Sequence, residues 1–222
     1  MNPRHSRIAQ IALLAAGEYG FALAGGYAIS AHGMGDRPSG DVDLFTDWHR
    51  RADFPTAVDA VIDALERHGY TVDIVLRHET FTRLLLAEPE AGWASEVAKL
   101  ELSADWRAHP PVTLDIGPVL HPDDAVANKM CALFGRAEAR DFLDVDAVLQ
   151  SGNFTRDRLL SLATAADAGF DPAMFADALG ALRQITDADF DLYGIGAEEL
   201  AAIRQRFADW RTQLRSPAVP SS

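Results

Sequence analysis

Two aspartates one residue apart, Asp41 and Asp43, open the apolar stretch DVDLFTD, and this pair constrains the chain more than any other feature. On a strand, side chains at i and i+2 point the same way, about 6.5–7 Å apart at the backbone. Two carboxylates placed so repel each other unless one takes up a proton or a cation lies between them. Such oxygen ligands suit Mg²⁺, which typically takes one or two carboxylates and keeps positions for water and substrate phosphates. The pair therefore predicts a divalent-cation site on a strand.

A pair of glycines precedes the aspartates. The segment GFALAGG, residues 20–26, is predicted to be a short buried strand ending in Gly25 and Gly26, and YAISAHG a small helix. Backbone N–H groups at a helix start attract anions, and the missing side chains let a phosphate approach. A polar loop containing Ser39 then leads into the aspartates. Together these residues predict a phosphate site beside the cation site.

A third carboxylate is needed if two metal ions are to be held. The segment EVAKLELSAD is predicted to be a strand, and alternation puts Lys99 and Glu101 on the same face. Glu101 is the first choice for the third ligand. Asp105, Asp115 and Asp73 are rivals, and each is also explained as an ordinary solvent-facing residue.

A second group of charged residues lies downstream, in NKMCALFGRAEARDFLDVDAVL. Lys129 could present a mobile point charge to a triphosphate, and Arg140 could hold a phosphate by two hydrogen bonds. Asp141 and Asp144 are one helical turn apart and share a face. Taken alone, this segment is better explained by surface ion pairs between neighbouring helices.

The remaining pattern predicts an α/β (α+β) fold in two parts. Residues 6–18 and 55–68 read as helices, and residues 70–87 as a hairpin turning at His78-Glu79. From Asp123 onward the periodicity is helical. We therefore predict an α/β domain over residues 1–122, an all-helical domain over 123–216 and a disordered tail over 217–222.

Composition narrows the function classes. The chain has no apolar run long enough to span a membrane, and its single cysteine, Cys131, excludes an internal disulfide and fits the reducing cytoplasm. The formal net charge of −13 argues against broad electrostatic capture of nucleic acid. The seven histidines show no i,i+4 pair and no cysteine partner, so no zinc site is predicted. Cys131 lies in an apolar helical run and is predicted to be a core residue.

The two charged segments resemble a known family. GGYAISAHGMGDRPSGDVDLF resembles the signature of the DNA polymerase β-like nucleotidyltransferases, with glycines on a helix turn followed by a D-x-D strand. NKMCALFGRAEARDFLDVDAVL resembles the second signature of one branch, the AbiEii/AbiGii abortive-infection toxins. The resemblance covers roughly residues 20–150. It implies a mixed-sheet nucleotidyltransferase core and an enzyme that moves a nucleotidyl group from an NTP, with Mg²⁺ or Mn²⁺, to an acceptor such as the 3′ end of a tRNA. If the protein is a toxin, its antitoxin would be a separate chain.

The resemblance also implies roles for individual residues. Gly25 and Gly26 would contact phosphate, and Asp41 and Asp43 would hold metal. Lys129 would steady the triphosphate, and Asp141 would take the late acidic position of the family. Arg37 matches a basic residue that precedes the D-x-D strand. The sequence departs from the superfamily at the third carboxylate, which is usually aspartate and is here Glu101.

Two other functions remain open from the sequence. The acceptor could be a small hydroxylated molecule of the aminoglycoside kind, since an acidic protein suits a cationic substrate. Alternatively, the fold could bind a nucleotide or partner protein without turnover, which the glutamate at position 101 and the acidic surface favour. A tRNA would need a local basic face, such as the arginines of the last helix, Arg204, Arg206, Arg211 and Arg215.

Overall fold

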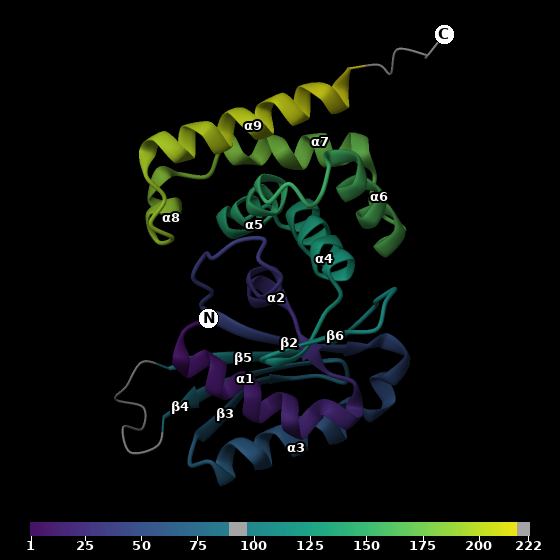
Figure 1. The fold of residues 1–222 in the computed structure, drawn as a ribbon, viewed down its shortest axis with the longest axis vertical. Helices are drawn as coiled ribbons and strands as arrows, with labels where there is room; N and C mark the ends of the chain where they lie inside the picture. The colour runs from purple at the N-terminus through teal and green to yellow at the C-terminus, as the bar shows by residue number, and fades with distance from the viewer. Residues whose placement is uncertain (89–96, 217–222) are drawn as a thin grey trace. The chain divides into compact units, whose positions relative to one another are not determined.

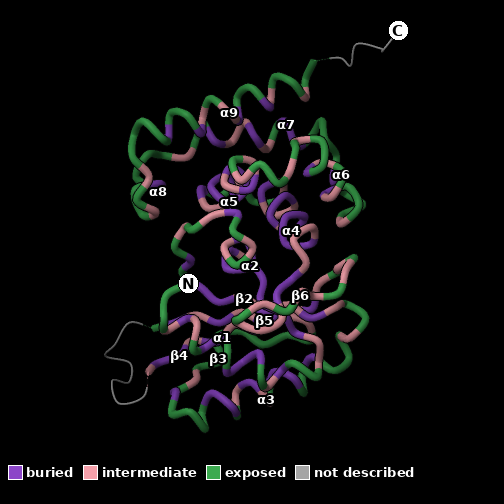
Figure 2. The backbone as a smooth tube through the Cα atoms, viewed as in Figure 1, coloured by how far each residue is buried: buried purple, intermediate pink, exposed green. Residues whose placement is uncertain are grey.

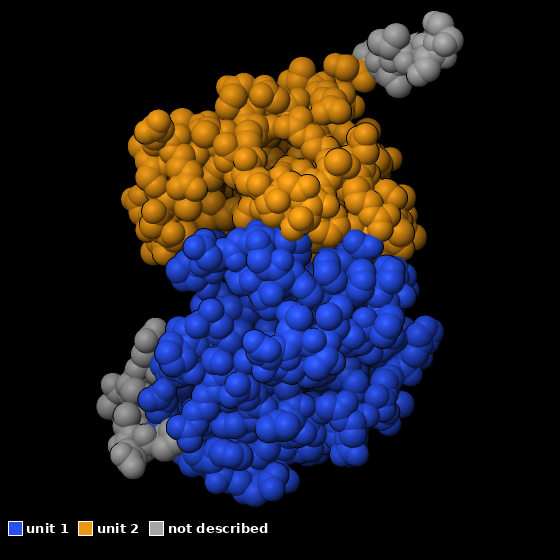
Figure 3. Space-filling model, viewed as in Figure 1, with its two compact units in different colours: residues 1–125 blue, residues 126–222 orange. Residues whose placement is uncertain are grey.

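The computed structural model describes residues 1–88 and 97–216. The predicted tail, residues 217–222, and the first residue of the predicted strand, Glu96, lie outside the described residues. The chain divides into two compact units, Met1–Ala125 and Val126–Ser222 (Figures 1 and 3).

The first unit contains a seven-stranded sheet in the order β3-β4-β5-β2-β1-β7-β6. β2 pairs in parallel with β5, and β1 in parallel with β7, while the other neighbours are antiparallel. The predicted α/β class with a mixed sheet is confirmed. The strands are β1 (Ala22–Leu23), β2 (Asp41–Asp47), β3 (Thr71–Arg77), β4 (Phe81–Ala87), β5 (Ala98–Asp105), β6 (Val112–Leu114) and β7 (Gly117–Val119).

Burial alternates along the central strands. In β2, Val42 and Leu44 are fully buried, and in β5 Leu100 and Leu102 are fully buried. Their neighbours in sequence are more exposed (Figure 2). Because successive side chains on a strand point to opposite faces, the apolar residues form the core and the charged residues gather on the other face. The sheet is thereby fixed in register, with one face available for polar chemistry.

Two helices, α1 (Pro3–Ala16) and α3 (Phe54–Arg67), pack against one face of the sheet, and α2 (Gly25–Ala31) lies on the opposite side (Figure 1). α1 begins three residues earlier than predicted because the Asn2 side chain accepts the N–H of His5 at 2.7 Å and caps the helix. Two short 3-10 helices complete the unit, η1 (Gly17–Tyr19) and η2 (Trp48–Asp53).

The strand before the glycines is shorter than predicted. The N–H of Ala24 still donates to the Asp43 carbonyl at 2.8 Å, but the next residue, Gly25, has φ +61° and turns the chain away. A left-handed φ of this kind favours glycine, since a Cβ there is strained. The two glycines therefore open α2 instead of closing β1.

The predicted hairpin is confirmed. β3 and β4 pair antiparallel, with a register shift between Ile74 and Leu76, and the connection contains His78 and Glu79. β4 then pairs with β5, which brings this hairpin beside the central strands.

The second unit is helical and has an aromatic core. Phe175 meets Trp210 edge-on at a centroid distance of 5.3 Å, and Phe142 meets Phe207 at 5.1 Å. These rings come from three different helices, so their contacts fix the packing of the unit. The helices from the start of α4 onward are α4 (Pro122–Gly135), α5 (Ala139–Gln150), α6 (Arg156–Ala166), α7 (Pro172–Gly180), η3 (Ala181–Arg183), α8 (Asp187–Asp191) and α9 (Ala197–Arg215).

Within the described residues, no helix combines the length and the apolar character needed to cross a membrane.

Candidate active site

Three carboxylates meet on the polar face of the sheet. Asp41, Asp43 and Glu101 each offer a carboxylate oxygen, and these oxygens all lie within 4.8 Å of one another. The register of the sheet explains the meeting, because Asp43 on β2 lies opposite Glu101 on β5 and Asp41 is two residues earlier on the same strand. We call this group the carboxylate platform. Of the acidic residues weighed for the third position, Glu101 is the one that the sheet places there.

A lysine neutralises part of the platform. The ammonium of Lys99 lies 2.7 Å from Oδ2 of Asp41 and 3.4 Å from Oε1 of Glu101. Burial lowers the pKa of Lys99, but the hydrogen bonds and the negative charges of Asp41 and Glu101 outweigh burial and raise it above its ordinary value. Arg83 on β4 adds a second cation, with Nε 2.8 Å from Oε1 of Glu101. Two cationic side chains, Lys99 and Arg83, therefore contact the carboxylates of the platform.

Gly25 lies directly against the platform. A Cβ at this position would lie 1.8 Å from Oδ2 of Asp43, far inside van der Waals contact. Together with φ +61°, this proximity means that both backbone conformation and space require glycine. The start of α2 is consequently held in contact with the Asp43 carboxylate.

The other predicted phosphate residues surround Gly26. A Cβ on Gly26 would lie 3.0 Å from Nη2 of Arg37 and 3.3 Å from Oγ of Ser39. The Ser39 hydroxyl is buried and donates towards the carbonyl of Asp41 at 3.1 Å and its Oδ1 at 3.2 Å. Gly26, Arg37 and Ser39 thus gather at the end of β2 that carries Asp41.

Tyr27 holds the backbone of Ser39 in place. Its hydroxyl donates to the Ser39 carbonyl at 3.1 Å and lies 2.6 Å from Nδ1 of His5. Burial raises the pKa of Tyr27, and the charge of Asp41 raises it further, so the hydroxyl keeps its proton and remains a donor. Sequence reasoning did not find Tyr27, because only the folded chain brings α1, α2 and the loop before β2 together.

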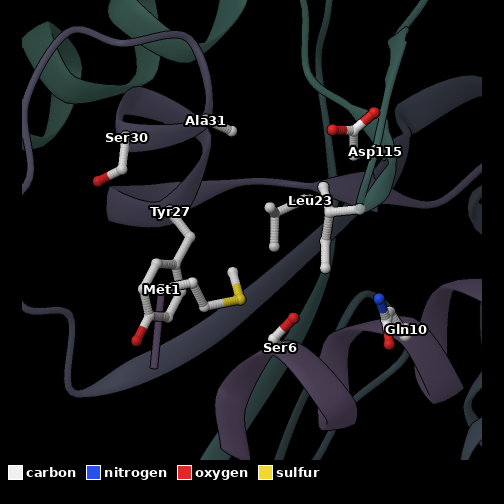
Figure 4. Close-up of a pocket in the computed structure, with 9 residues that line it drawn as sticks. Met1, Ser6, Gln10, Leu23, Tyr27, Ser30, Ala31 and Asp115 are labelled. Atoms are coloured by element: carbon white, nitrogen blue, oxygen red, sulfur yellow. The ribbon is translucent and has the colours of Figure 1, made fainter. Parts of the chain in front are cut away.

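The rival acids lie elsewhere. Asp73 is exposed on β3, at the edge of the sheet. Asp105 ends β5, where burial raises its pKa and the N–H of Trp106 opposes the rise. Asp115 lies between β6 and β7 and lines a pocket of about 290 Å³, which Tyr27 and Ser30 of α2 and residues of α1 also line (Figure 4).

The predicted residues of the second unit form ion pairs, and the carboxylates of Asp141 and Asp144 are buried. The Lys129 ammonium lies 2.9 Å from Oδ2 of Asp144, and both side chains are largely buried. Asp141 is fully buried, accepts two hydrogen bonds from Arg136 at 2.7 and 2.8 Å, and caps α5 through the N–H of Glu138. Arg140 donates to Glu138 at 2.8 Å. Ion pairing is therefore present in this segment, and the catalytic roles of these residues stay predictions.

Comparison with known proteins places this geometry in a family. The family model described as the nucleotidyl transferase AbiEii toxin of Type IV toxin–antitoxin systems matches residues 10–221. The chain belongs to the AbiEii nucleotidyltransferase toxin family. The resemblance seen in the sequence is confirmed, and the chain is a nucleotidyltransferase by family.

Solved structures share the AbiEii fold at low sequence identity. JHP933 from Helicobacter pylori superposes with a TM-score of 0.59 and 16% identity, over 95% of this chain and 92% of that one. MenT4, a nucleotidyltransferase toxin from Mycobacterium tuberculosis, superposes with a TM-score of 0.58 and 19% identity, over 97% of this chain and 84% of that one. No curated protein is significantly similar in sequence.

The carboxylate platform of this AbiEii protein suits a hard divalent cation. Its donors are all carboxylate oxygens, the ligands that Mg²⁺ prefers. The Lys99 ammonium lies against Asp41 and Glu101, so a positive charge already stabilises these carboxylates. Sequence reasoning put Lys99 on the face of Glu101 but did not find its contact with Asp41, which depends on the pairing of β2 with β5.

We predict a structural contribution from Asp141. Asp141→Ala removes the carboxylate that caps α5 and both hydrogen bonds that Arg136 donates to it, which is expected to cost about 2–4 kcal/mol of folding stability. Thermal unfolding measures this loss, and Asp191→Ala, at an exposed position, is the control. An unchanged melting temperature together with lost nucleotidyl transfer would instead assign Asp141 to the chemistry.

Proposed function

We propose that this toxin is a Mg²⁺-dependent enzyme that transfers NMP from an NTP to an acceptor hydroxyl, with Mn²⁺ able to replace Mg²⁺. The observation that carries the proposal is the convergence of Asp41, Asp43 and Glu101 on one point beside the Gly25 backbone. Lys99 and Arg83 offset part of the repulsion among these carboxylates, and a divalent cation would offset the rest while holding a triphosphate beside them.

In the proposed reaction, the acceptor oxygen forms a bond to the α-phosphorus as the bond between the α-phosphorus and the bridging oxygen breaks. Pyrophosphate leaves with the electron pair of that bond, and the proton of the acceptor hydroxyl passes to a carboxylate of the platform or to water. The divalent cation, when bound, lowers the pKa of the hydroxyl and neutralises charge on the phosphates. Asp41, Asp43 and Glu101 would hold it, and the strands that carry them would keep the reacting atoms in line.

The residues around α2 are proposed to bind the triphosphate. Gly25 and Gly26 let the phosphate approach the backbone, and Arg37 supplies a cation next to Gly26. Ser39 orients Asp41 through its hydroxyl. In the second unit, Lys129 and Arg140 are proposed to contribute charge to nucleotide binding, a role tested by comparing KM for the NTP in Lys129→Met and Arg140→Met.

The acceptor is proposed to be an RNA hydroxyl, such as the 3′ end of a tRNA, and the protein is proposed to act in the cytoplasm with a separate antitoxin. The family description supports the toxin role. The net charge of −13 argues for a local contact with RNA rather than a long basic groove.

The experiment is a screen of the four labelled NTPs with Mg²⁺ against total RNA, tRNA, aminoglycosides and the protein itself. We expect label on RNA, resolved by gel and mass spectrometry, and none without divalent cation. Label on an aminoglycoside would move the acceptor to small molecules. Absence of label in every arm, with intact folded protein, would favour a binding module without turnover.

We predict that Lys99→Met tightens Mg²⁺ binding by about 5-fold, because the Lys99 ammonium competes for the same oxygens of Asp41 and Glu101. The affinity is measured by calorimetry in the absence of nucleotide. Arg67→Met, at an exposed position of α3, controls for the loss of one positive charge. Weaker Mg²⁺ binding in Lys99→Met alone would show that Lys99 assists the cation instead of competing with it.

A further inference from the structure

Two histidines and an aspartate gather at a second place in the first unit. His109, His121 and Asp123 each offer a ligand atom, and these atoms all lie within 4.8 Å of one another. His109 lies in the loop between β5 and β6, while His121 and Asp123 lie at the start of α4. Sequence spacing alone did not predict this group, since the histidines are twelve residues apart.

The hairpin of β6 and β7 brings the histidines together. These strands pair antiparallel with Val112 opposite Val119. The residues just before β6 and just after β7 therefore lie close together, and these include His109 and His121. The rings of His109 and His121 stack at a centroid distance of 4.3 Å and an interplanar angle of 22°. The fold therefore places the two histidine rings next to each other.

The orientation of His109 suits a metal ligand. Asp124, which is almost fully buried, accepts the backbone N–H groups of Ala108 at 3.0 Å and His109 at 2.9 Å. Its Oδ1 also lies 3.4 Å from Nδ1 of His109. A carboxylate beside Nδ1 favours the tautomer that carries its proton there, which leaves the lone pair on Nε2. This carboxylate–histidine arrangement is the usual support of a metal-binding imidazole.

The backbone that carries His121 is fixed as well. The N–H of Leu120 donates to the Leu23 carbonyl at 2.9 Å, and the Leu120 carbonyl lies 2.7 Å from Nε2 of His32. Nδ1 of His121 accepts the N–H of Asp123 at 3.2 Å, so an ion bound at this nitrogen would take the place of that N–H. His121 and Asp123 are both partly exposed, and an ion from solvent can reach them.

We propose that His109, His121 and Asp123 form a binding site for a Zn²⁺-class transition metal, separate from the carboxylate platform. Two imidazoles and one carboxylate are a ligand set that suits Zn²⁺, and water would complete the four positions. Ligands about 2.0–2.2 Å from a common ion lie at most about 4.4 Å apart, and an imidazole binds a metal in the plane of its ring. The two stacked rings would therefore turn out of the stack on binding, until both planes pass through the ion. The platform, with oxygen donors only, selects hard cations instead.

The bound metal would fasten the β5–β6 loop to the first turn of α4. Asp124 already makes this connection through Ala108 and His109, and the metal would add a second link on the outer side. We therefore expect Zn²⁺ to act on the stability of this connection and not to take part in nucleotidyl transfer.

The test uses the full chain in millimolar MgCl₂, titrated with ZnCl₂ by calorimetry. We expect about one equivalent of Zn²⁺ to bind, and His109→Ala or His121→Ala to weaken this binding by at least about 10-fold. His78→Ala, at an exposed position of the β3–β4 connection, is the matched control and is expected to bind as the wild type does. A free Zn²⁺ concentration about 100 times the Kd should raise the melting temperature by about 5 °C.

A spectroscopic measurement does not require the variants to fold. Co²⁺ added to the wild-type protein in Mg²⁺ should give visible absorption bands of a nitrogen-ligated site, and Zn²⁺ should shift the ring signals of two histidines in NMR spectra. Wild-type protein that binds no Zn²⁺ under these conditions would overturn the proposal, as would equal binding by the wild type and both histidine variants. None of these readouts uses catalysis, so they stand apart from the test of nucleotidyl transfer.

Discussion

Asp43→Asn is expected to abolish nucleotidyl transfer while leaving the fold intact. Asp43 lies at the centre of the carboxylate platform, opposite Glu101 and against Gly25. Loss of its charge weakens the hold on the cation that neutralises the transition state, which is worth several kcal/mol, and hence a fall of at least about 10³-fold in rate. Labelling of RNA by NTP under single-turnover conditions measures the fall.

The same variant separates a catalytic from a structural role. Asparagine keeps the size of aspartate and removes one of three clustered negative charges, so the melting temperature without metal should stay the same or rise. Mn²⁺ binding, followed by electron paramagnetic resonance, should weaken. Asp73→Asn, at an exposed position on β3, is the control and should change none of these quantities. Full activity in Asp43→Asn would remove the platform from the mechanism.

Local pattern was enough to predict one half of the platform. Asp41 and Asp43 share a face because strands have a period of two, and the same rule joined Lys99 to Glu101. The contact between these two pairs joins residues that are far apart in the sequence, since α3 and the β3–β4 hairpin lie between β2 and β5 along the chain. Glu101 could therefore be ranked above its rivals by its pattern, but only the register of the sheet puts it opposite Asp43.

Contacts that depend on tertiary folding were beyond the sequence. The contact between Lys99 and Asp41, and the support of Ser39 by Tyr27, each need two elements to be placed first. Helical spacing does not predict the histidine cluster, because a hairpin brings His109 next to His121. The segment VTLDIGPV indicates a short hairpin, and such a hairpin predicts that the residues before and after it lie close together.

Gly25→Ala is expected to reduce nucleotidyl transfer by about 10²-fold, through displacement of Asp43. The added Cβ would lie 1.8 Å from Oδ2 of that carboxylate, and neither the start of α2 nor the central strand β2 can move away without breaking the Ala24–Asp43 hydrogen bond. The Asp43 side chain must therefore rotate off its position, and a misplacement of about 1 Å at a reacting centre costs on the order of 10²-fold. The Mn²⁺ affinity should fall in parallel.

Backbone strain must be separated from this collision, and the chain offers a matched control. Gly33 has φ +70°, close to the +61° of Gly25, but a Cβ there would meet no atom within 4 Å. Gly33→Ala and Gly25→Ala should both lose about 1–2 kcal/mol of stability from the left-handed conformation, yet only Gly25→Ala should lose activity and Mn²⁺ binding. Equal activity losses in the two variants would attribute the effect to strain, and Gly25 would then have no special relation to the carboxylate it touches.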